Sequence, residues 1–300
     1  MLDRSEYLKN FMQEFEYPAE ASHALLKTYY AILENSDAYA IFEQMLRLYE
    51  SDLVFDYGGW VKMMPRVSKA CNEPSETVDL VFVLCLSEHL RELYLRRGLD
   101  IQIYKDSCLD FKAKLMECHD IRGVWGTFVT DWFSRFFNLT RFALGRLQFE
   151  INPVPSEMSA KGRIVHAGDP AVSIHIPSIG PLSENACRES FIKASEFFAC
   201  GFKDGVVPFR CGSWLLAPEH RHMLKPDANI LKFMNFFNIT PQEKTVEGDL
   251  WRIFGQQDCS NISALPRDNS LRRAYASEIE KGNMPHIGIG LFFMKDGKFL

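Results

Sequence analysis

The sequence lacks the features that mark membrane proteins and nucleic-acid-binding proteins. No run of about twenty apolar residues, the length that crosses a bilayer, occurs in the 300 residues. Residues 1–6 are charged and contain no apolar segment of the kind found in signal peptides. The net charge is only -5, and no basic tract is interleaved with aromatic residues. We therefore expect a globular, cytoplasmic protein whose partners include neither a membrane nor a nucleic acid.

Paired cysteines and metal-binding spacings are also missing. The eight cysteines (71, 85, 108, 118, 187, 200, 211 and 259) include no C-x-x-C pair, and most lie on apolar faces of expected elements. Reduced core thiols explain this distribution better than a disulfide framework or a zinc site does. A His-x-His occurs at 220–222, but at the start of a helix that spacing turns the two rings apart, so no metal site is predicted.

Several catalytic motifs are absent as well. The sequence contains no G-x-S-x-G, no G-x-x-x-x-G-K-[ST], no H-E-x-x-H and no G-x-G-x-x-G between a strand and a helix. Residues 210–214 are similar to the cysteine-protease pattern C-G-S-C-W but lack its nucleophile. These absences argue against the corresponding hydrolase, nucleotide-binding and metalloprotease classes.

The apolar pattern that is present divides the chain into two halves. Residues 1–145 show a helical period almost throughout, and residues 146–300 alternate strand and helix patterns. We therefore predict an α+β protein with a helical N-terminal domain, 1–145, and a mixed sheet domain, 146–300, with helices on the sheet faces.

Individual helices and strands are predicted from the hydrophobic period and from the glycines, prolines and capping residues that bound each segment. The expected helices are 24–33, 38–53, 75–97, 131–144, 184–198, 229–237 and 270–281. The expected strands are 146–151, a hairpin of 162–166 with 172–176, then 209–216, 250–254 and 287–294. Residues 99–104 fit a short strand or a helix-joining loop, and 56–60 and 120–126 fit a tight loop or a helix start.

The clearest local unit is the strand, turn and helix over 172–198. His175 is a polar residue on an otherwise apolar strand, and Ser183 is placed to N-cap the following helix. A helix start after a strand suits a phosphate group, but a plain packing unit without a ligand explains the pattern too. Glu184 already supplies negative charge at the helix start.

His175 and Cys211 lie on two expected central strands, with Ser213 on the same face as Cys211. If these strands are adjacent and parallel, the histidine can serve as a general base and the thiol or hydroxyl can return a proton. The alternative is a histidine satisfied by one buried hydrogen bond, beside a packed cysteine.

An ordered series of short motifs carries a family resemblance. The motifs are L-G-R-L-Q-F-E at 144–150, H-I-P at 175–177 followed by G-P-L at 180–182, S-W-L-L-x-P at 213–218, and N-I at 229–230. Together they resemble a bacterial family of two-domain acyltransferase-domain proteins, which join an N-acyltransferase N-terminal domain to a GNAT-like C-terminal domain. The resemblance covers most of the chain.

The resemblance implies a site for acetyl-CoA or another acyl-CoA. Residues 174–177, including Ile174 and Ile176, would line the coenzyme arm. Gly180, Leu182 and Ser183 would face the pyrophosphate, and residues 211–214, ending at Trp214, would form the other side of the cleft. One departure stands out, because the glycine-rich pyrophosphate pattern Q/R-x-x-G-x-G/A is absent, and the single glycine precedes a proline that lacks a backbone donor.

Our leading hypothesis is therefore an acyl-CoA-dependent N-acyltransferase that acts on a small-molecule or peptide amine. His175 or Glu150 would be the base, and Cys211 or Ser213 would protonate the departing thiolate. The competing hypotheses are a non-catalytic binding or scaffold protein that has lost the coenzyme loop, and a thiol-dependent hydrolase centred on Cys211. The sequence makes no prediction of oligomeric state.

Overall fold

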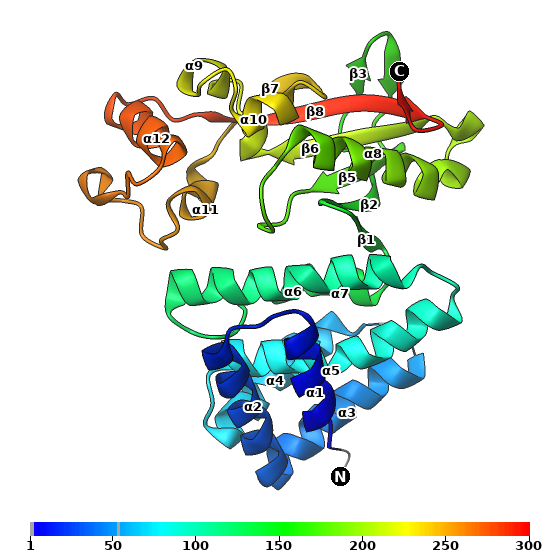
Figure 1. Cartoon of the computed structure of the whole chain (residues 1–300), viewed down its shortest axis with the longest axis vertical. Coiled ribbons are helices and arrows are strands. Elements are labelled where there is room, and N and C mark those ends of the chain that lie inside the picture. Colours follow the sequence, from blue (N-terminus) through cyan, green and yellow to red (C-terminus); the bar gives the residue numbers. More distant parts are fainter. Residues whose placement is uncertain (1–2, 53–54) are drawn as a thin grey trace. The chain divides into compact units, whose positions relative to one another are not determined.

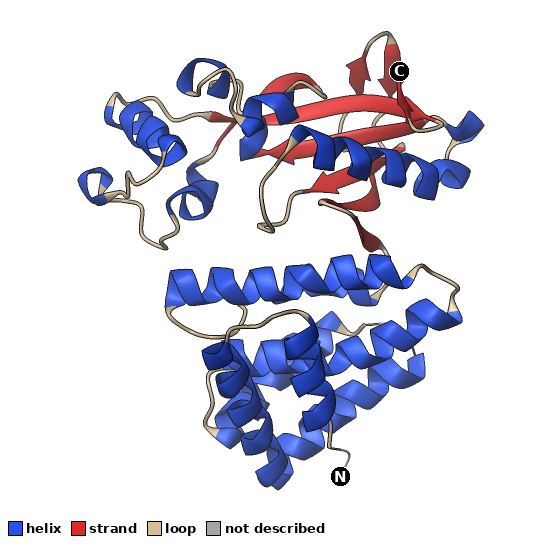
Figure 2. Cartoon of the chain, viewed as in Figure 1, coloured by secondary structure: helices blue, strands red, loops and turns tan. Residues whose placement is uncertain are grey.

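The computed structural model describes residues 3–52 and 55–300. The chain divides into two compact units, Met1–Phe142 and Ala143–Leu300, and each is described by itself. Figure 2 distinguishes the helices of the first unit from the strands, which concentrate in the second. Within the described residues, no helix combines the length and the apolar character needed to span a membrane.

The described part of the first unit is helical (Figure 1). Its helices are α1 (Ser5–Glu14), α2 (Ala19–Glu34), α3 (Ser36–Asp52), α4 (Tyr57–Cys71), α5 (Ser75–Arg96), α6 (Ile101–Arg122) and α7 (Thr130–Phe137). The helices predicted at 24–33, 38–53 and 75–97 are confirmed in α2, α3 and α5, although the predicted end at Leu53 lies outside the described residues. Residues 56–60 prove to be a helix start, because the Asp56 side chain caps α4 by accepting from Gly59 N at 2.9 Å.

The short strand predicted as one alternative for residues 99–104 was wrong, and the helix-joining loop is confined to Leu99 and Asp100. Residues 101–104 open α6, a helix of 22 residues whose N-cap, Asp100, accepts from Gln102 N. The alternation of Ile101 and Ile103 resembles a strand and conceals the helical spacing of buried side chains, which begins at Tyr104. Buried side chains at Tyr104, Cys108, Phe111, Leu115 and Cys118 follow that period.

The turn after α6 is tight because Gly126 touches backbone. A Cβ at Gly126 would lie 2.3 Å from the carbonyl carbon of Glu76, and Thr127 N donates to Glu76 O at 2.9 Å. Only glycine fits this approach. The helix predicted over 131–144 is too long, since α7 ends at Phe137 and Leu139 adopts a left-handed φ of 51°. Residues 141–144 form a strand instead.

The second unit is built on a mixed sheet. Its strand order is β1-β2-β5-β6-β8-β7, with β9 paired to β8. The strands are β1 (Arg141–Leu144), β2 (Leu147–Pro153), β5 (Pro170–His175), β6 (Val207–Ser213), β7 (Asn238–Thr245), β8 (His286–Lys295) and β9 (Lys298–Phe299). Strands β5 and β6 are parallel, whereas β2 and β5, β6 and β8, and β7 and β8 are antiparallel.

The predicted hairpin of 162–166 with 172–176 was wrong. Strand β4 (Arg163–Val165) pairs with β3 (Met158–Ala160), while β5 pairs with β2. The β3–β4 turn consists of Lys161 and Gly162, both with positive φ, which is the geometry of a two-residue hairpin. This turn closes the hairpin before the chain reaches Gly168.

The helices of the second unit are α8 (Glu184–Phe198), α9 (His220–Met223), α10 (Asn229–Met234), α11 (Leu250–Phe254) and α12 (Ser270–Glu280). Helices α8, α10 and α12 and the last strand, β8, match the predictions. The strand predicted at 250–254 is the helix α11, because Leu250, Ile253 and Phe254 turn one helical face into a cluster with Tyr275 and Ala276. The strand predicted at 209–216 ends at Ser213, and β7, an edge strand with a proline, was not predicted.

The two faces of the sheet are covered differently. On one face, which we call the helix face, Phe191 of α8 packs against Phe149, Phe209 and Phe292, with ring centroids 4.9–6.3 Å apart. The other, the hairpin face, meets β3 and β4 through an apolar cluster. That cluster consists of Val154, Ala160, Val165, Ala171, Leu291 and Phe293.

A buried carboxyl in the first unit generates a stability prediction. Trp60 Nε1 donates to Asp79 Oδ1 at 2.6 Å, and burial raises the pKa of Asp79 to about 6 from 3.8. Because the folded-state pKa lies above the ordinary one, the folded state favours the protonated form, and ionisation destabilises it as pH rises through about 6. Asp79→Asn keeps an acceptor for the indole. We expect it to stabilise the protein at pH 8 by on the order of 1–2 kcal/mol and not at pH 4.

Denaturant unfolding at both pH values checks this expectation, with Asp227→Asn, at an exposed turn, as the control. An equal gain at pH 4 and pH 8 would show that the effect does not come from the ionisation of Asp79.

Candidate active site

A histidine and a glutamate meet on the hairpin face of the sheet. The β2–β5 register pairs Gln148 with His175 and Glu150 with Ser173, so these four side chains share one face. His175 Nε2 lies 2.8 Å from Glu150 Oε1. The Glu150 side chain is 6% exposed and that of His175 is 23% exposed.

This pair has the arrangement of a base oriented by a carboxylate. A neutral His175 that donates Nε2–H to Glu150 carries its lone pair on Nδ1. The buried carboxylate also stabilises the imidazolium that forms when the ring accepts a proton. Partial exposure of the ring leaves it reachable. The dyad can therefore take a proton from a nucleophile that approaches the end of β5.

The structure separates Cys211 from His175. Register pairs join Val172 to Phe209 and Ser173 to Arg210, so β5 and β6 are adjacent and parallel, as predicted. Cys211 follows Phe209 by two residues and therefore points to the helix face, whereas His175 shares the hairpin face with Ser173. The expectation that the two side chains lie close together was wrong. Side chains along a strand alternate between the two faces of the sheet, and in the β5–β6 register Cys211 and His175 fall on opposite faces.

Cys211 and Ser213 are both engaged in packing or capping. Cys211 is 1% exposed, and burial raises the pKa of its thiol to about 12. Ser213 Oγ accepts from Leu215 N at 3.1 Å and caps the short 3-10 helix Trp214–Leu216. These placements disfavour both residues as the proton donor, and they disfavour a hydrolase centred on Cys211.

The ends of β5 and β6 leave the pairing early. Within the described residues, register pairs cover Val172–Ser173 and Phe209–Arg210, and none joins 174–175 to 211–213. Ile174 is buried on the helix face and Ile176 is half-buried just beyond the strand. Trp214 packs edge-on to Tyr275, with ring centroids 6.2 Å apart.

The turn before α8 is held by an arginine that the sequence analysis did not single out. Arg146 donates from Nε to Pro181 O and from Nη2 to Gly180 O, both at 3.1 Å. Gly180 has a φ of +64°, and the turn is exposed. The motif L-G-R-L-Q-F-E contains Arg146, so the signal was present without a role assigned to it.

The helix start itself is as predicted. Ser183 Oγ accepts from Ala186 N at 3.4 Å and caps α8. Glu184, whose charge raised doubt about an anion site, pairs with Arg188 one turn along the helix at 3.1 Å. Its carboxylate is thus partly neutralised. Together with Arg146, this arrangement makes the turn more favourable to an anion than the sequence suggested.

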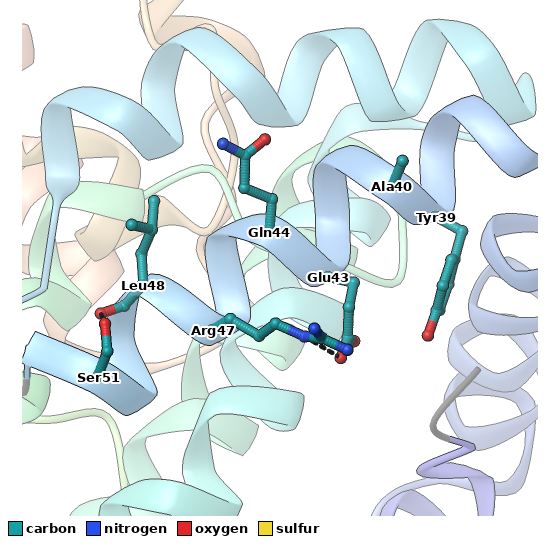
Figure 3. A pocket seen from close by; sticks show the side chains of 7 residues that line it. All are labelled: Tyr39, Ala40, Glu43, Gln44, Arg47, Leu48 and Ser51. Atoms are coloured by element: carbon teal, nitrogen blue, oxygen red, sulfur yellow. Dashed lines mark hydrogen bonds and ion pairs between the residues drawn. The ribbon is translucent and has the colours of Figure 1, made fainter.

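The described residues also contain hollows and histidines outside this site. Figure 3 shows a surface hollow of the first unit whose lining residues, from Tyr39 to Ser51, all come from α3. No group of three or more metal-ligating side chains occurs among the described residues. In the His-x-His, His222 is exposed while His220 is buried, with Nε2 2.7 Å from Tyr275 Oη. Burial lowers the pKa of His220 to about 4.

Comparison with known proteins agrees with this architecture. Residues 6–139 match the model of the N-acyltransferase N-terminal domain, and residues 141–292 match that of the GNAT-like C-terminal domain. The chain belongs to the family with these two domains, as the motif series indicated. A search of curated protein sequences finds no significant match.

Several solved acyltransferase structures share this fold. A mutant acyltransferase in complex with octanoyl-CoA has a TM-score of 0.73 and 19% identity, over 97% of this chain and 88% of that one. An acyltransferase in complex with decanoyl-CoA and teicoplanin has a TM-score of 0.68 at 19% identity, with the same coverage of 97% and 88%. An acyltransferase in complex with decanoyl-CoA has a TM-score of 0.69 at 16% identity, over 97% and 88%.

The placement of Cys211 predicts a slow thiol. In the native protein at pH 8, we expect iodoacetamide to label Cys211 at least roughly 100-fold more slowly than the exposed Cys200, because its thiolate is scarce and shielded. Peptide mass spectrometry over a time course measures both rates. In denaturant the two rates should converge. Equal labelling of the native protein would contradict the packing described above and restore Cys211 as a nucleophile.

Proposed function

We propose that this protein is an acyl-CoA-dependent N-acyltransferase whose general base is His175, oriented by Glu150. The observation that supports this most directly is the 2.8 Å contact between His175 Nε2 and Glu150 Oε1. The contact lies at the point where the parallel strands β5 and β6 cease to pair. Membership of a family with acyltransferase domains supplies the reaction class.

The proposed reaction is direct transfer. The amine attacks the thioester carbonyl, so that a C–N bond forms and, as the intermediate collapses, the C–S bond breaks. The amine proton passes to His175 and from His175 to the departing thiolate, so no other donor is required. Glu150 stabilises the imidazolium between these two transfers. Backbone N–H groups at the parted strand ends stabilise the negative charge on the carbonyl oxygen.

The coenzyme would lie along the end of β5 and the turn before α8. Ile174 and Ile176 would line its arm, and the turn from Gly180 to Ser183 would meet its phosphates. In place of a glycine-rich cradle, Arg146 holds this turn through two carbonyl oxygens and adds positive charge beside it. The helix start contributes its unpaired N–H groups.

The acyl group and acceptor are proposed from the related structures. These proteins were crystallised with octanoyl-CoA or decanoyl-CoA, and one also with teicoplanin. We propose a medium-length acyl chain and a small-molecule amine acceptor for this chain as well.

Octanoyl-CoA is the probe that tests the function. We expect saturable binding by isothermal titration, and transfer to at least one amine in a panel of primary amines, detected by mass spectrometry. His175→Ala should lower the transfer rate by about 10²-fold or more and change the Kd for octanoyl-CoA by less than about twofold. Glu150→Gln should lower the rate less, because the base remains.

The chain offers a matched control for the dyad. His166 Nδ1 lies 2.8 Å from Glu157 Oε2, with both side chains about two-thirds exposed, and His166 precedes β5 at the end of that strand opposite to His175. His166→Ala and Glu157→Gln should leave transfer unchanged. A full rate in His175→Ala would refute the assignment of the base. No binding of any acyl-CoA would refute the function and favour the binding or scaffold protein.

Arg146 gives a separate prediction for the phosphate contact. We expect Arg146→Met to weaken octanoyl-CoA binding by about tenfold and to leave binding of S-octanoyl-pantetheine, which lacks the diphosphate and the nucleotide, unchanged. Isothermal titration measures both. Arg163→Met, at an exposed arginine of β4, is the control. Equal loss for the two ligands would show that Arg146 acts only on the fold of the turn.

A further inference from the structure

Arg210 is a cation that no acidic side chain of the described residues pairs with, one strand from the proposed base. It lies on β6 opposite Ser173 of β5, and thus on the hairpin face with His175 and Glu150. Among the described residues its side chain makes no hydrogen bond or ion pair, and its Nε is shielded from solvent. Burial lowers the pKa of its guanidinium from the ordinary value.

Another arginine of this chain, Arg4, is buried and has carboxylate partners that neutralise its charge. Arg4 is 3% exposed and lies 2.9 Å from Glu43 and 3.1 Å from Glu50. A guanidinium taken out of water without a partner destabilises the fold. Arg210 is half-buried, and its shielded Nε bears a cost that no described residue offsets. A ligand that brings an anion would offset it.

The guanidinium of Arg210 extends toward the proposed base. A Cβ built on Gly212 would lie 3.8 Å from Arg210 Nη2, so the side chain runs along β6 toward Gly212. Gly212 follows Arg210 by two residues, as His175 follows its neighbour Ser173. The guanidinium therefore extends toward the end of β6 that follows its last register pair with β5, and His175 follows the same pair on β5.

A second side chain without a hydrogen-bond partner among the described residues, Gln148, lies next to His175. Gln148 lies directly opposite His175 in the β2–β5 register and is 0% exposed. Neither its Oε1 nor its Nε2 has a hydrogen-bond partner among the described residues. Buried amides are normally paired. The base thus has a guanidinium on one side and a carboxamide on the other, both with donors to offer.

We propose that Arg210, assisted by Gln148, binds a carboxylate on the amine acceptor, so that the acceptor class is an amino acid or a peptide whose carboxylate lies near the reacting amine. This inference rests on the proposed function. A guanidinium fork matches a carboxylate with two parallel hydrogen bonds. Held in this way, the carboxylate places the amine beside His175. A coenzyme phosphate has related chemistry and is the other source of the anion.

The test uses the acylated product, which joins acyl chain and carboxylate in one molecule. We expect N-octanoylglycine to bind the wild-type protein at least tenfold more tightly than N-octanoylglycinamide by isothermal titration. Arg210→Gln should abolish this preference, and Arg210→Lys, which keeps the charge but not the fork, should retain a smaller one. Arg163→Gln, at an exposed arginine of β4, is the matched control and should keep the full preference.

Folding is checked with the same variants. Because the Arg210 side chain has no partner in the part of the chain that the structure describes, Arg210→Gln should unfold at the same temperature as the wild type or a higher one. A large fall in its Tm would show a structural role and overturn the proposal. Equal Kd values for the acid and the amide, or no saturable binding of either, would also overturn it.

Titration with octanoyl-CoA separates the remaining outcomes. If Arg210→Gln weakens octanoyl-CoA as strongly as it weakens N-octanoylglycine, the arginine serves a coenzyme phosphate and the proposal fails. If the wild type binds octanoyl-CoA but does not distinguish acid from amide, this inference fails and the proposed function stands. If the wild type binds no acyl-CoA, the proposed function itself fails.

Discussion

The short parallel contact between β5 and β6 organises the second unit. Two parallel strands need a crossover connection, and α8 is the helix in that connection between His175 and Val207. The crossover places α8 on one face of the sheet, where Phe191 packs on the aromatic residues of β2, β6 and β8. Because the register pairs end at Ser173 and Arg210, the strand ends and the start of α8 come together at one edge.

This arrangement also divides the chemistry of the sheet. The helix face is a core of phenylalanine rings with Cys211 buried in it. The hairpin face changes along the strands from the apolar cluster under β3 and β4 to a polar group formed by Gln148, Glu150, His175 and Arg210. A proton acceptor, a cation and an amide on one face suit the recognition of a polar substrate. The thiol on the opposite face is not accessible to that substrate.

The presence or absence of an oppositely charged partner distinguishes charged side chains that stabilise the fold from those that we propose to act on substrates. Arg4 is surrounded by carboxylates, and Glu184 is paired with Arg188 on its own helix. Arg146 and Arg210 lack acidic partners among the described residues, and both border the region assigned to the substrates. Arg146 donates to carbonyl oxygens, which orients a turn, and the Arg210 side chain has no acceptor among the described residues. The first therefore fits a positioning role, and the second fits contact with a ligand.

Features that depend only on residues close together in the chain could be predicted from the sequence. Helix α8 with its Ser183 cap, α5, α12 and the strands β5 and β8 follow from short-range period and capping, and the motif series indicated the family. Prediction from short-range sequence pattern failed in two places. Leu250, Ile253 and Phe254 form a helix because that conformation packs all three against Tyr275. At the start of α6, two alternating isoleucines conceal the helical pattern. Tertiary structure alone decided that β4 pairs with β3, that His175 meets Glu150, and that Cys211 faces away, because register between strands distant in sequence is set by the packing of both sheet faces.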